Sequence, residues 1–259
     1  MKILIFTDAH FGENINYETI GGKDYVNVFG SQFPKLLKKL KPKFKNYDLI
    51  VNLGDSIFNK NKNADIKRYK QFLNLFKGVK IPVIHLFGNH DTKFIPQEKL
   101  NRFIGERKEY YSKDIRGIHH IILTAESHHM GFNPHISREQ IGWLKKDIQK
   151  TSLPVIVYTH FLLTEQSSKE NYYFSPFKEN MILIEERKEI RKILEESKKV
   201  LLVLNGHMHF YHKEKINRIT YLTLPSICEN DKKGKPTEEY LELLIDNKKR
   251  VKWKLKKLK

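Results

Sequence analysis

Residue types that bind metal ions recur at five places in the sequence, each directly after a short apolar run. In chain order these groups are Asp8-Ala9-His10, Gly54-Asp55, Gly88-Asn89-His90-Asp91, His160 and Gly206-His207-Met208-His209. Carboxylates and imidazoles bind hard-to-borderline divalent ions such as manganese, iron and zinc. So many ligand-type residues exceed the needs of one ion. Two ions about 3.5–4 Å apart that share a carboxylate would use them all.

The apolar runs before these groups predict buried strands, because each is short and ends at a turn or a charged residue. The predicted strands cover residues 2–6, 48–53, 81–87, 154–158 and 200–204. Apolar residues at helical spacing predict helices over residues 33–40, 69–76, 136–148 and 181–196. Strands that alternate with helices indicate an α/β fold with a largely parallel centre. Ligands bind beyond the carboxyl ends of such strands, so all five groups should converge on one edge.

The last third of the chain has a different pattern. Residues 219–224 and 240–245 are strand-like, and residues 251–256 alternate apolar side chains with lysines, as in a half-buried strand. No linker or repeat interrupts the chain, so we expect residues 1–259 to form a single domain. Two long segments, residues 11–31 and 161–180, follow predicted strands and should determine specificity.

The chain carries a formal net charge of +18, which a nucleic-acid partner would explain. The charge is mostly lysine and spread along the whole chain, whereas arginine, the usual bidentate reader of phosphate, is sparse. This pattern favours a general attraction for anionic phosphoester substrates over sequence-specific nucleic-acid binding.

The single cysteine, Cys228, excludes an internal disulfide and suits a reducing cytoplasm. The apolar run at the start is too short for a signal peptide, and no stretch approaches the length of a membrane span. We therefore expect a cytoplasmic protein without a membrane partner. The sequence does not fix its oligomeric state.

Taken together and in order, the five groups resemble the full signature of the calcineurin-like metallophosphoesterase superfamily, from residue 8 to residue 209. Within it, the chain is similar to the cyclic-nucleotide phosphodiesterase-like branch. That similarity rests on the Gly-Asn-His-Asp form of the third group and on residues 137–144, which resemble a helix of that branch. The resemblance implies an α/β fold of a particular kind, a four-layer α/β/β/α sandwich with two mixed sheets.

The resemblance also implies a role for each residue of the site. The ligands of the first metal ion would be Asp8, His10, Asp55 and His209. The ligands of the second would be Asp55, Asn89, His160 and His207, with Asp55 bridging. Asn89 and His90 would face the substrate, His90 would protonate the leaving group, and Asp91 would orient His90.

Other residues have an ordinary structural explanation beside a functional one. Asp91 could equally cap the helix that follows it. His135 could line the site or belong to a loop, and Tyr172 and Tyr173 could form a stacking wall for a base or pack onto their own domain. His85 is expected in the core, and His119, His120, His128 and His129 at the surface.

We therefore expect a dinuclear metal-dependent hydrolase of phosphate mono- or diesters, in which a hydroxide that bridges manganese, iron or zinc ions attacks phosphorus. The alternative, favoured by the charge, is a DNA or RNA nuclease of the same superfamily. A catalytically silent scaffold is disfavoured, because no ligand position is missing.

Overall fold

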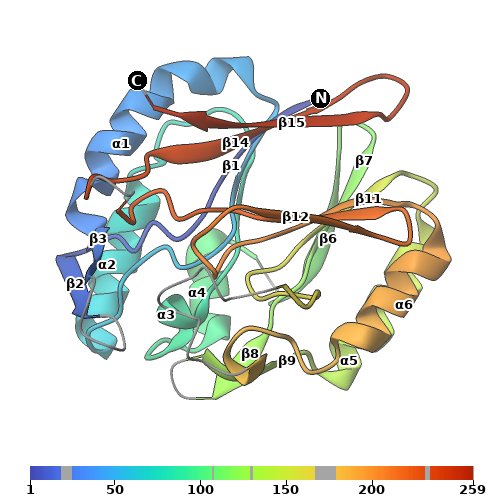
Figure 1. Cartoon of the computed structure of the whole chain (residues 1–259), viewed down its shortest axis with the longest axis horizontal. Coiled ribbons are helices and arrows are strands. Elements are labelled where there is room, and N and C mark those ends of the chain that lie inside the picture. Colours follow the sequence, from blue (N-terminus) through green and yellow to red (C-terminus); the bar gives the residue numbers. More distant parts are fainter. Residues whose placement is uncertain (19–24, 107, 129–130, 167–178, 231–233, 259) are drawn as a thin grey trace.

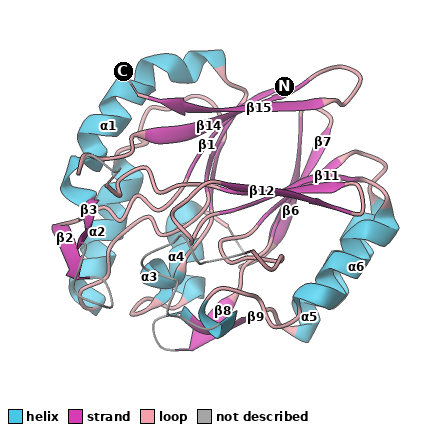
Figure 2. Cartoon of the chain, viewed as in Figure 1, coloured by secondary structure: helices cyan, strands magenta, loops and turns pink. Residues whose placement is uncertain are grey.

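The computed structural model describes residues 1–18, 25–106, 108–128, 131–166, 179–230 and 234–258. Two β-sheets pack face to face, and helices cover the outer face of each (Figures 1 and 2). Among the described residues, no helix is both long and apolar enough to cross a membrane.

The first sheet has five strands in the order β15-β14-β1-β4-β5. At its centre, β1 (Lys2–Phe6) lies parallel to β4 (Leu49–Asn52), which lies parallel to β5 (Val83–His85). On the other side, β14 (Glu239–Ile245) pairs antiparallel with β1, and β15 (Val251–Lys257) pairs antiparallel with β14. The sheet is therefore mixed, and the strands that precede the first three ligand groups are its parallel part.

The second sheet has six strands in the order β12-β13-β11-β10-β7-β6. Their bounds are β6 (Tyr111–Ile115), β7 (Ile118–Ile122), β10 (Val155–Tyr158), β11 (Val200–Asn205), β12 (His212–Ile216) and β13 (Ile219–Thr223). The four inner strands are parallel, whereas β6 and β12 pair antiparallel at the two edges. This sheet is also mixed, and β10 and β11 precede the last two ligand groups.

Alternation along the strands separates three hydrophobic cores. In β1, Ile3 and Ile5 face the second sheet and pack with residues such as Tyr158 and Leu204. The opposite face of the first sheet packs against α1 (Phe33–Leu40) and α2 (Lys62–Asn74). The outer face of the second sheet packs against α5 (Arg138–Lys150) and α6 (Arg187–Ser197). The predicted four-layer α/β/β/α sandwich with two mixed sheets is confirmed.

Smaller elements lie in segments that the sequence left as loops. They are β2 (Asn14–Glu18), β3 (Tyr25–Phe29), β8 (Glu126–His128), β9 (Phe132–His135), α3 (Asn89–Thr92), α4 (Gln97–Ile104) and the 3-10 turns η1 (Gly30–Gln32), η2 (Lys41–Asn46) and η4 (Glu179–Met181). The β2–β3 hairpin belongs to the long segment 11–31, and η4 lies at the end of the segment 161–180. Both long segments are partly outside the described residues.

The surface positions predicted for His119 and His120 are wrong, because both lie buried in β7. The ring nitrogens of His119 lie 2.6 Å and 2.8 Å from the carboxylates of Asp114 and Asp147. Nδ1 of His120 lies 2.8 Å from the Tyr158 hydroxyl. Polar partners from neighbouring elements thus allow imidazoles inside a strand that is covered on both faces. The core position predicted for His85 is confirmed.

Candidate metal centre

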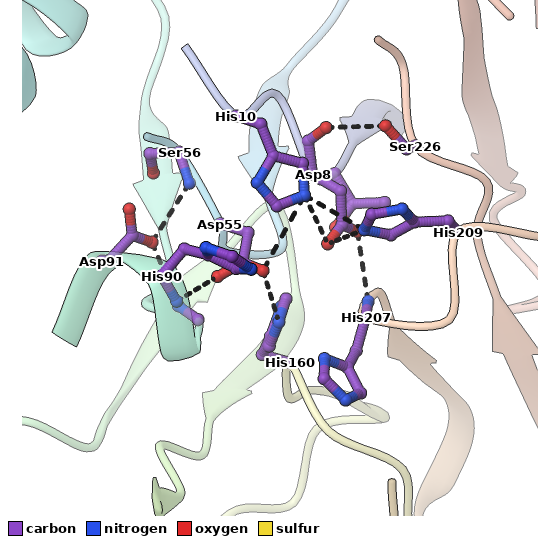
Figure 3. Close-up of polar contacts among 12 residues, drawn as sticks. Asp8, His10, Asp55, Ser56, His90, Asp91, His160, His207, His209 and Ser226 are labelled. Carbon is purple, nitrogen blue, oxygen red and sulfur yellow. Dashed lines mark hydrogen bonds and ion pairs between the residues drawn. The ribbon is translucent and has the colours of Figure 1, made fainter. Parts of the chain in front are cut away.

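The five ligand groups meet at one edge of the two sheets, where the parallel strands of both end (Figure 3). Asp8 and His10 follow β1, Asp55 follows β4, and Asn89 and His90 begin α3 just after β5. The remaining three, His160, His207 and His209, follow β10 and β11. The convergence expected from strand positions is therefore what the structure shows.

Three overlapping triads have ligand atoms within 4.8 Å of one another. They are Asp8 with His10 and His209, Asp55 with His160 and His207, and His10 with Asp55 and His90. The first triad lies within the set predicted for one ion, and the second lies within the set predicted for the other. The third shows that His90 lies beside these ligands.

The Asp55 carboxylate lies between the two predicted ligand sets. Its Oδ2 atom is 3.9 Å from Nε2 of His10 and 3.4 Å from Nε2 of His160. Its Oδ1 atom accepts the backbone N–H of His90 at 2.9 Å. One oxygen of this buried carboxylate therefore reaches histidines of both sets, as a bridging ligand must.

Among the described residues, hydrogen bonds hold only one oxygen of the Asp8 carboxylate. Its Oδ2 atom accepts hydrogen bonds from Oγ1 of Thr7 at 2.6 Å and from the backbone N–H of His207 at 3.1 Å. Its Oδ1 atom is 3.2 Å from Nε2 of His209. The carboxylate is thus fixed by the loop after β11 while Oδ1 faces the other ligands.

The backbone at the site adopts the left-handed conformation, which residues other than glycine rarely adopt. Five predicted ligands have positive φ, namely Asp8 (52°), His10 (43°), Asp55 (48°), His207 (70°) and His209 (58°). A non-glycine residue in this left-handed region costs about 1–3 kcal/mol and persists where the surroundings determine it. Such strain is concentrated at functional sites. At each of these positions the left-handed backbone turns the chain away from the strand direction, and the side chain faces the other predicted ligands.

Two glycines make room for the carboxylates. A Cβ atom added to Gly88 would collide with the Asp55 side chain, and one added to Gly206 would collide with Thr7 and Asp8. The glycines of the third and fifth groups are therefore required by close packing around the ligands.

The donor atoms fit divalent ions. Oδ1 of Asn89 is buried and has no hydrogen-bond partner among the described residues. Oδ1 of Asp8 and Nε2 of His160 are buried too, and each faces another predicted ligand instead of a hydrogen-bond partner. Buried polar atoms without a partner cost free energy, and a bound cation would satisfy all three. The mixture of carboxylate, amide and imidazole donors suits manganese, iron or zinc.

The second ring nitrogen of three ligand histidines is occupied by the protein. Nδ1 of His160 donates to the Leu53 carbonyl oxygen at 2.9 Å, and Nε2 of His207 donates to the Met181 carbonyl oxygen at 2.8 Å. Nδ1 of His209 bonds to the carboxylate of Glu229. These bonds fix which nitrogen of each ring faces the centre.

Charge at the centre is unevenly distributed. Burial and the neighbouring His90 lower the pKa of His10 to about 3. Burial opposes protonation of His160 too, but the Asp55 carboxylate raises its pKa to about 9. Burial also disfavours the charged form of Asp8, yet His209 holds the pKa of Asp8 at about 2. The Asp8 and Asp55 carboxylates therefore stay ionised at neutral pH and present negative charge to a cation.

His90 is oriented by a residue that the sequence did not single out. Its Nδ1 atom lies 2.6 Å from Oδ1 of Asn59, which is in the loop after β4. The Phe58 ring also packs against His90, with centroids 4.9 Å apart. Asn59 follows Asp55 by four residues, and a polar side chain so close to a bridging ligand was the available signal.

Asp91, expected to orient His90, makes different contacts. Its carboxylate accepts backbone N–H groups of Ser56 and Ile57, both at 3.1 Å, and of Gly88 at 3.0 Å. The bond to Gly88 is the helix cap that was the alternative. Burial raises the pKa of Asp91 to about 7, as does the nearby Asp55. Asp91 thus holds the backbone of two ligand loops and not the His90 ring.

The described contacts of the other predicted substrate-binding residue, His135, include none of the predicted ligands. His135 lies in β9, where its described contacts are with Glu126, His128 and the backbone of Asn133. Tyr172 and Tyr173 lie outside the described residues. Glu229 was missed, and no motif marks it, because it lies 20 residues beyond His209, in an isolated bridge to Val28 and outside any regular strand.

The family model described as calcineurin-like phosphoesterase matches residues 1–211. A probable cyclic nucleotide phosphodiesterase of Fibrobacter succinogenes is 24% identical over 164 residues, which cover 62% of this chain and 56% of that protein. One of Xenorhabdus bovienii is 26% identical over 167 residues, or 62% of each. The chain thus spans less than two thirds of these relatives.

Two solved structures share the fold. A dimetal phosphatase from Danio rerio has a TM-score of 0.77 at 13% identity, with 98% of this chain and 95% of that chain covered. A purple acid phosphatase from yellow lupin seeds has a TM-score of 0.65 at 14% identity, with 99% of this chain and 51% of that chain covered. At such identities the likeness concerns the fold alone.

Proposed function

Because the chain belongs to the calcineurin-like phosphoesterases, we propose that it hydrolyses phosphate esters at a pair of divalent metal ions. The observation that carries the proposal is the position of Asp55, whose Oδ2 atom reaches His10 of one ligand set and His160 of the other. A carboxylate shared in this way is what a pair of ions about 3.5–4 Å apart requires.

The proposed ligand sets are those that the family resemblance implies. Asp8, His10, Asp55 and His209 would hold the first ion. Asp55, Asn89, His160 and His207 would hold the second. When bound, the ions supply an activated water and neutralise charge on the phosphoryl oxygens. Their identity is proposed as manganese, iron or zinc.

His90 supplies the proton to the leaving group. Its Nδ1 atom is held by Asn59, so Nε2 is the nitrogen that remains for the substrate. The ring lies at the centre, 4.8 Å from that of His10. Burial lowers the pKa of His90, and an anionic phosphate beside the ring would favour the protonated form. A positioned acid of this kind contributes about 10²–10⁴-fold to the rate.

The substrate class we propose is a small phosphodiester or phosphomonoester, with cyclic nucleotides first. The two curated relatives are named as probable cyclic nucleotide phosphodiesterases, which supports this choice. A nuclease activity is the second candidate, and the net charge of +18 favours it.

A substrate screen tests both candidates. The protein, stripped of metal and reconstituted with Mn²⁺, Fe²⁺ or Zn²⁺, is assayed with nitrophenyl phosphate, bis(nitrophenyl) phosphate, cyclic nucleotides and single-stranded DNA. We expect metal-dependent turnover of the small esters, with the stripped protein as control. Turnover confined to DNA would support the nuclease instead. No turnover of any ester by protein that holds two ions would refute the proposed function.

A further inference from the structure

The histidines of the two ligand sets differ in what holds them. In the set with Asn89, the second nitrogens of both His160 and His207 bond to backbone carbonyl oxygens. In the set with Asp8, Nδ1 of His209 bonds to the carboxylate of Glu229. Nδ1 of His10, the other imidazole of that set, has no hydrogen-bond partner among the described residues. Among these histidines, His209 of the first set therefore has a carboxylate as the partner of its second nitrogen, whereas His160 and His207 have carbonyl oxygens.

Glu229 is built into the protein at this position. The side chain is 10% exposed, and the His209 side chain is 17% exposed. Oγ of Ser226 accepts the backbone N–H of Glu229 at 3.0 Å and donates to the Asp8 carbonyl oxygen at 2.8 Å (Figure 3). The carbonyl oxygen of Glu229 accepts the N–H of Thr237 at 2.8 Å. The segment that carries Glu229 is thus tied to the same strand end that carries Asp8.

We propose that Glu229 is a positioning residue for the first metal ion, an inference that rests on the proposed function. The carboxylate keeps the proton of His209 on Nδ1 and directs Nε2 toward Asp8, 3.2 Å away. A carboxylate partner also raises the basicity of the imidazole, which strengthens its bond to a cation. Because the described residues give His10 no such partner, Glu229 distinguishes the first set from the second, and it makes the affinities of the two ions depend on different residues.

The chain supplies this residue from outside the region that matches the family. The match ends at residue 211, whereas Glu229 lies between β13 and β14, in the C-terminal part of the chain. The segment after the last ligand group therefore does more than complete the two sheets. It provides the carboxylate that orients the last ligand.

Substitution of Glu229 by glutamine tests the inference, because Glu229→Gln keeps the size of the side chain and removes its charge. Titration of metal-stripped protein with Mn²⁺, followed by calorimetry, should show two binding events in the wild type. In Glu229→Gln, one affinity should fall by about 10–100-fold, and the other should stay unchanged. The unchanged event also shows that the variant is folded.

Glu126→Gln is the matched control, since it removes another glutamate that faces a histidine, His135, which is not a predicted ligand. Both affinities should keep their wild-type values in this variant. A second readout is nitrogen NMR of the Zn²⁺-loaded protein, where the Nδ1–H signal of His209 should be protected in the wild type and lost or shifted in Glu229→Gln.

Three outcomes would decide against the inference. If Glu229→Gln binds both ions with wild-type affinity, Glu229 has no positioning role and the proposed function stands. If both affinities fall equally, the effect is not specific to one set, and the inference also fails. If the wild type itself binds fewer than two ions, the proposed function fails first.

Discussion

Asp55→Asn is the substitution that separates a two-ion centre from any site with one ion. The amide keeps the shape of the side chain and an oxygen donor, but it removes a charge that the structure places between His10 and His160. Asp55 is 1% exposed, so bulk water cannot replace that charge. The effect should therefore fall on the binding of both ions together.

The expected magnitude follows from the charges. Two divalent ions about 4 Å apart repel by about 16 kcal/mol at an effective dielectric constant of about 20, and a bridging carboxylate offsets much of this. Its loss should weaken the second binding event by more than the roughly 100-fold that follows removal of an outer partner. We expect the stoichiometry of Asp55→Asn to fall from two ions to one.

Elemental analysis after reconstitution with Mn²⁺ and desalting measures this stoichiometry directly, with turnover of nitrophenyl phosphate as a second readout. Asp147→Asn is a matched control, because Asp147 also lies beside a histidine, His119, at 2.8 Å but is not a predicted ligand. The reasoning is refuted if Asp55→Asn retains two ions with wild-type affinity, since no bridging ligand would then have been removed.

Three further results are expected. His90→Asn should keep both ions but slow esters with poor leaving groups by about 10²–10⁴-fold, and far less an activated nitrophenyl ester; an equal loss on both would favour a purely electrostatic role. Chelation of the metal should lower the midpoint of thermal unfolding, since ions held at 1,000 times their Kd stabilise the fold by about 4 kcal/mol; an unchanged midpoint would count against buried ions. Glu242→Gln should lower the free energy of unfolding by about 2 kcal/mol at pH 7. Burial raises the pKa of Glu242, but hydrogen bonds from Lys2, Lys256 and Tyr47 outweigh the effect of burial and hold this pKa at about 2. This stability is present above the unfolded pKa of about 4.5 and lost as pH falls through about 2, so chemical denaturation should show the variant and wild type converging at low pH.

Much of the site could be predicted because its residues follow strands. A parallel strand has a recognisable apolar run, and its carboxyl end fixes the sheet edge at which the next residue lies. Asp8, Asp55 and His160 each follow such a run, so their convergence needed no knowledge of long-range packing. The same pattern predicted an α/β fold, because strands alternating with helices restrict the architecture, whereas the four layers were implied by the family resemblance.

Residues that act through distant contacts could not be predicted in this way. Glu229 lies in an isolated bridge to Val28, outside any regular strand, so no periodic pattern marks it, and its role depends on its approach to His209. A surface position is expected for His119 because it flanks a strand-like run, yet Asp114 and Asp147 from neighbouring elements satisfy both its nitrogens. In each case carboxylates from other elements decide the environment of the histidine.

The neighbours His90 and Asp91 show why adjacency in sequence is a poor guide to contact in a helix. Both lie in α3, where consecutive side chains diverge by about 100° because a turn holds 3.6 residues. When His90 faces the ligands, Asp91 must point into the protein, toward the backbone of Ser56 and Ile57. Its carboxylate therefore ties the loop that carries Asp55 to the loop that carries Asn89. Asp91 thus connects Asp55, the proposed bridging ligand, to Asn89, a proposed ligand of the second ion, while Asn59 orients His90, the proposed acid.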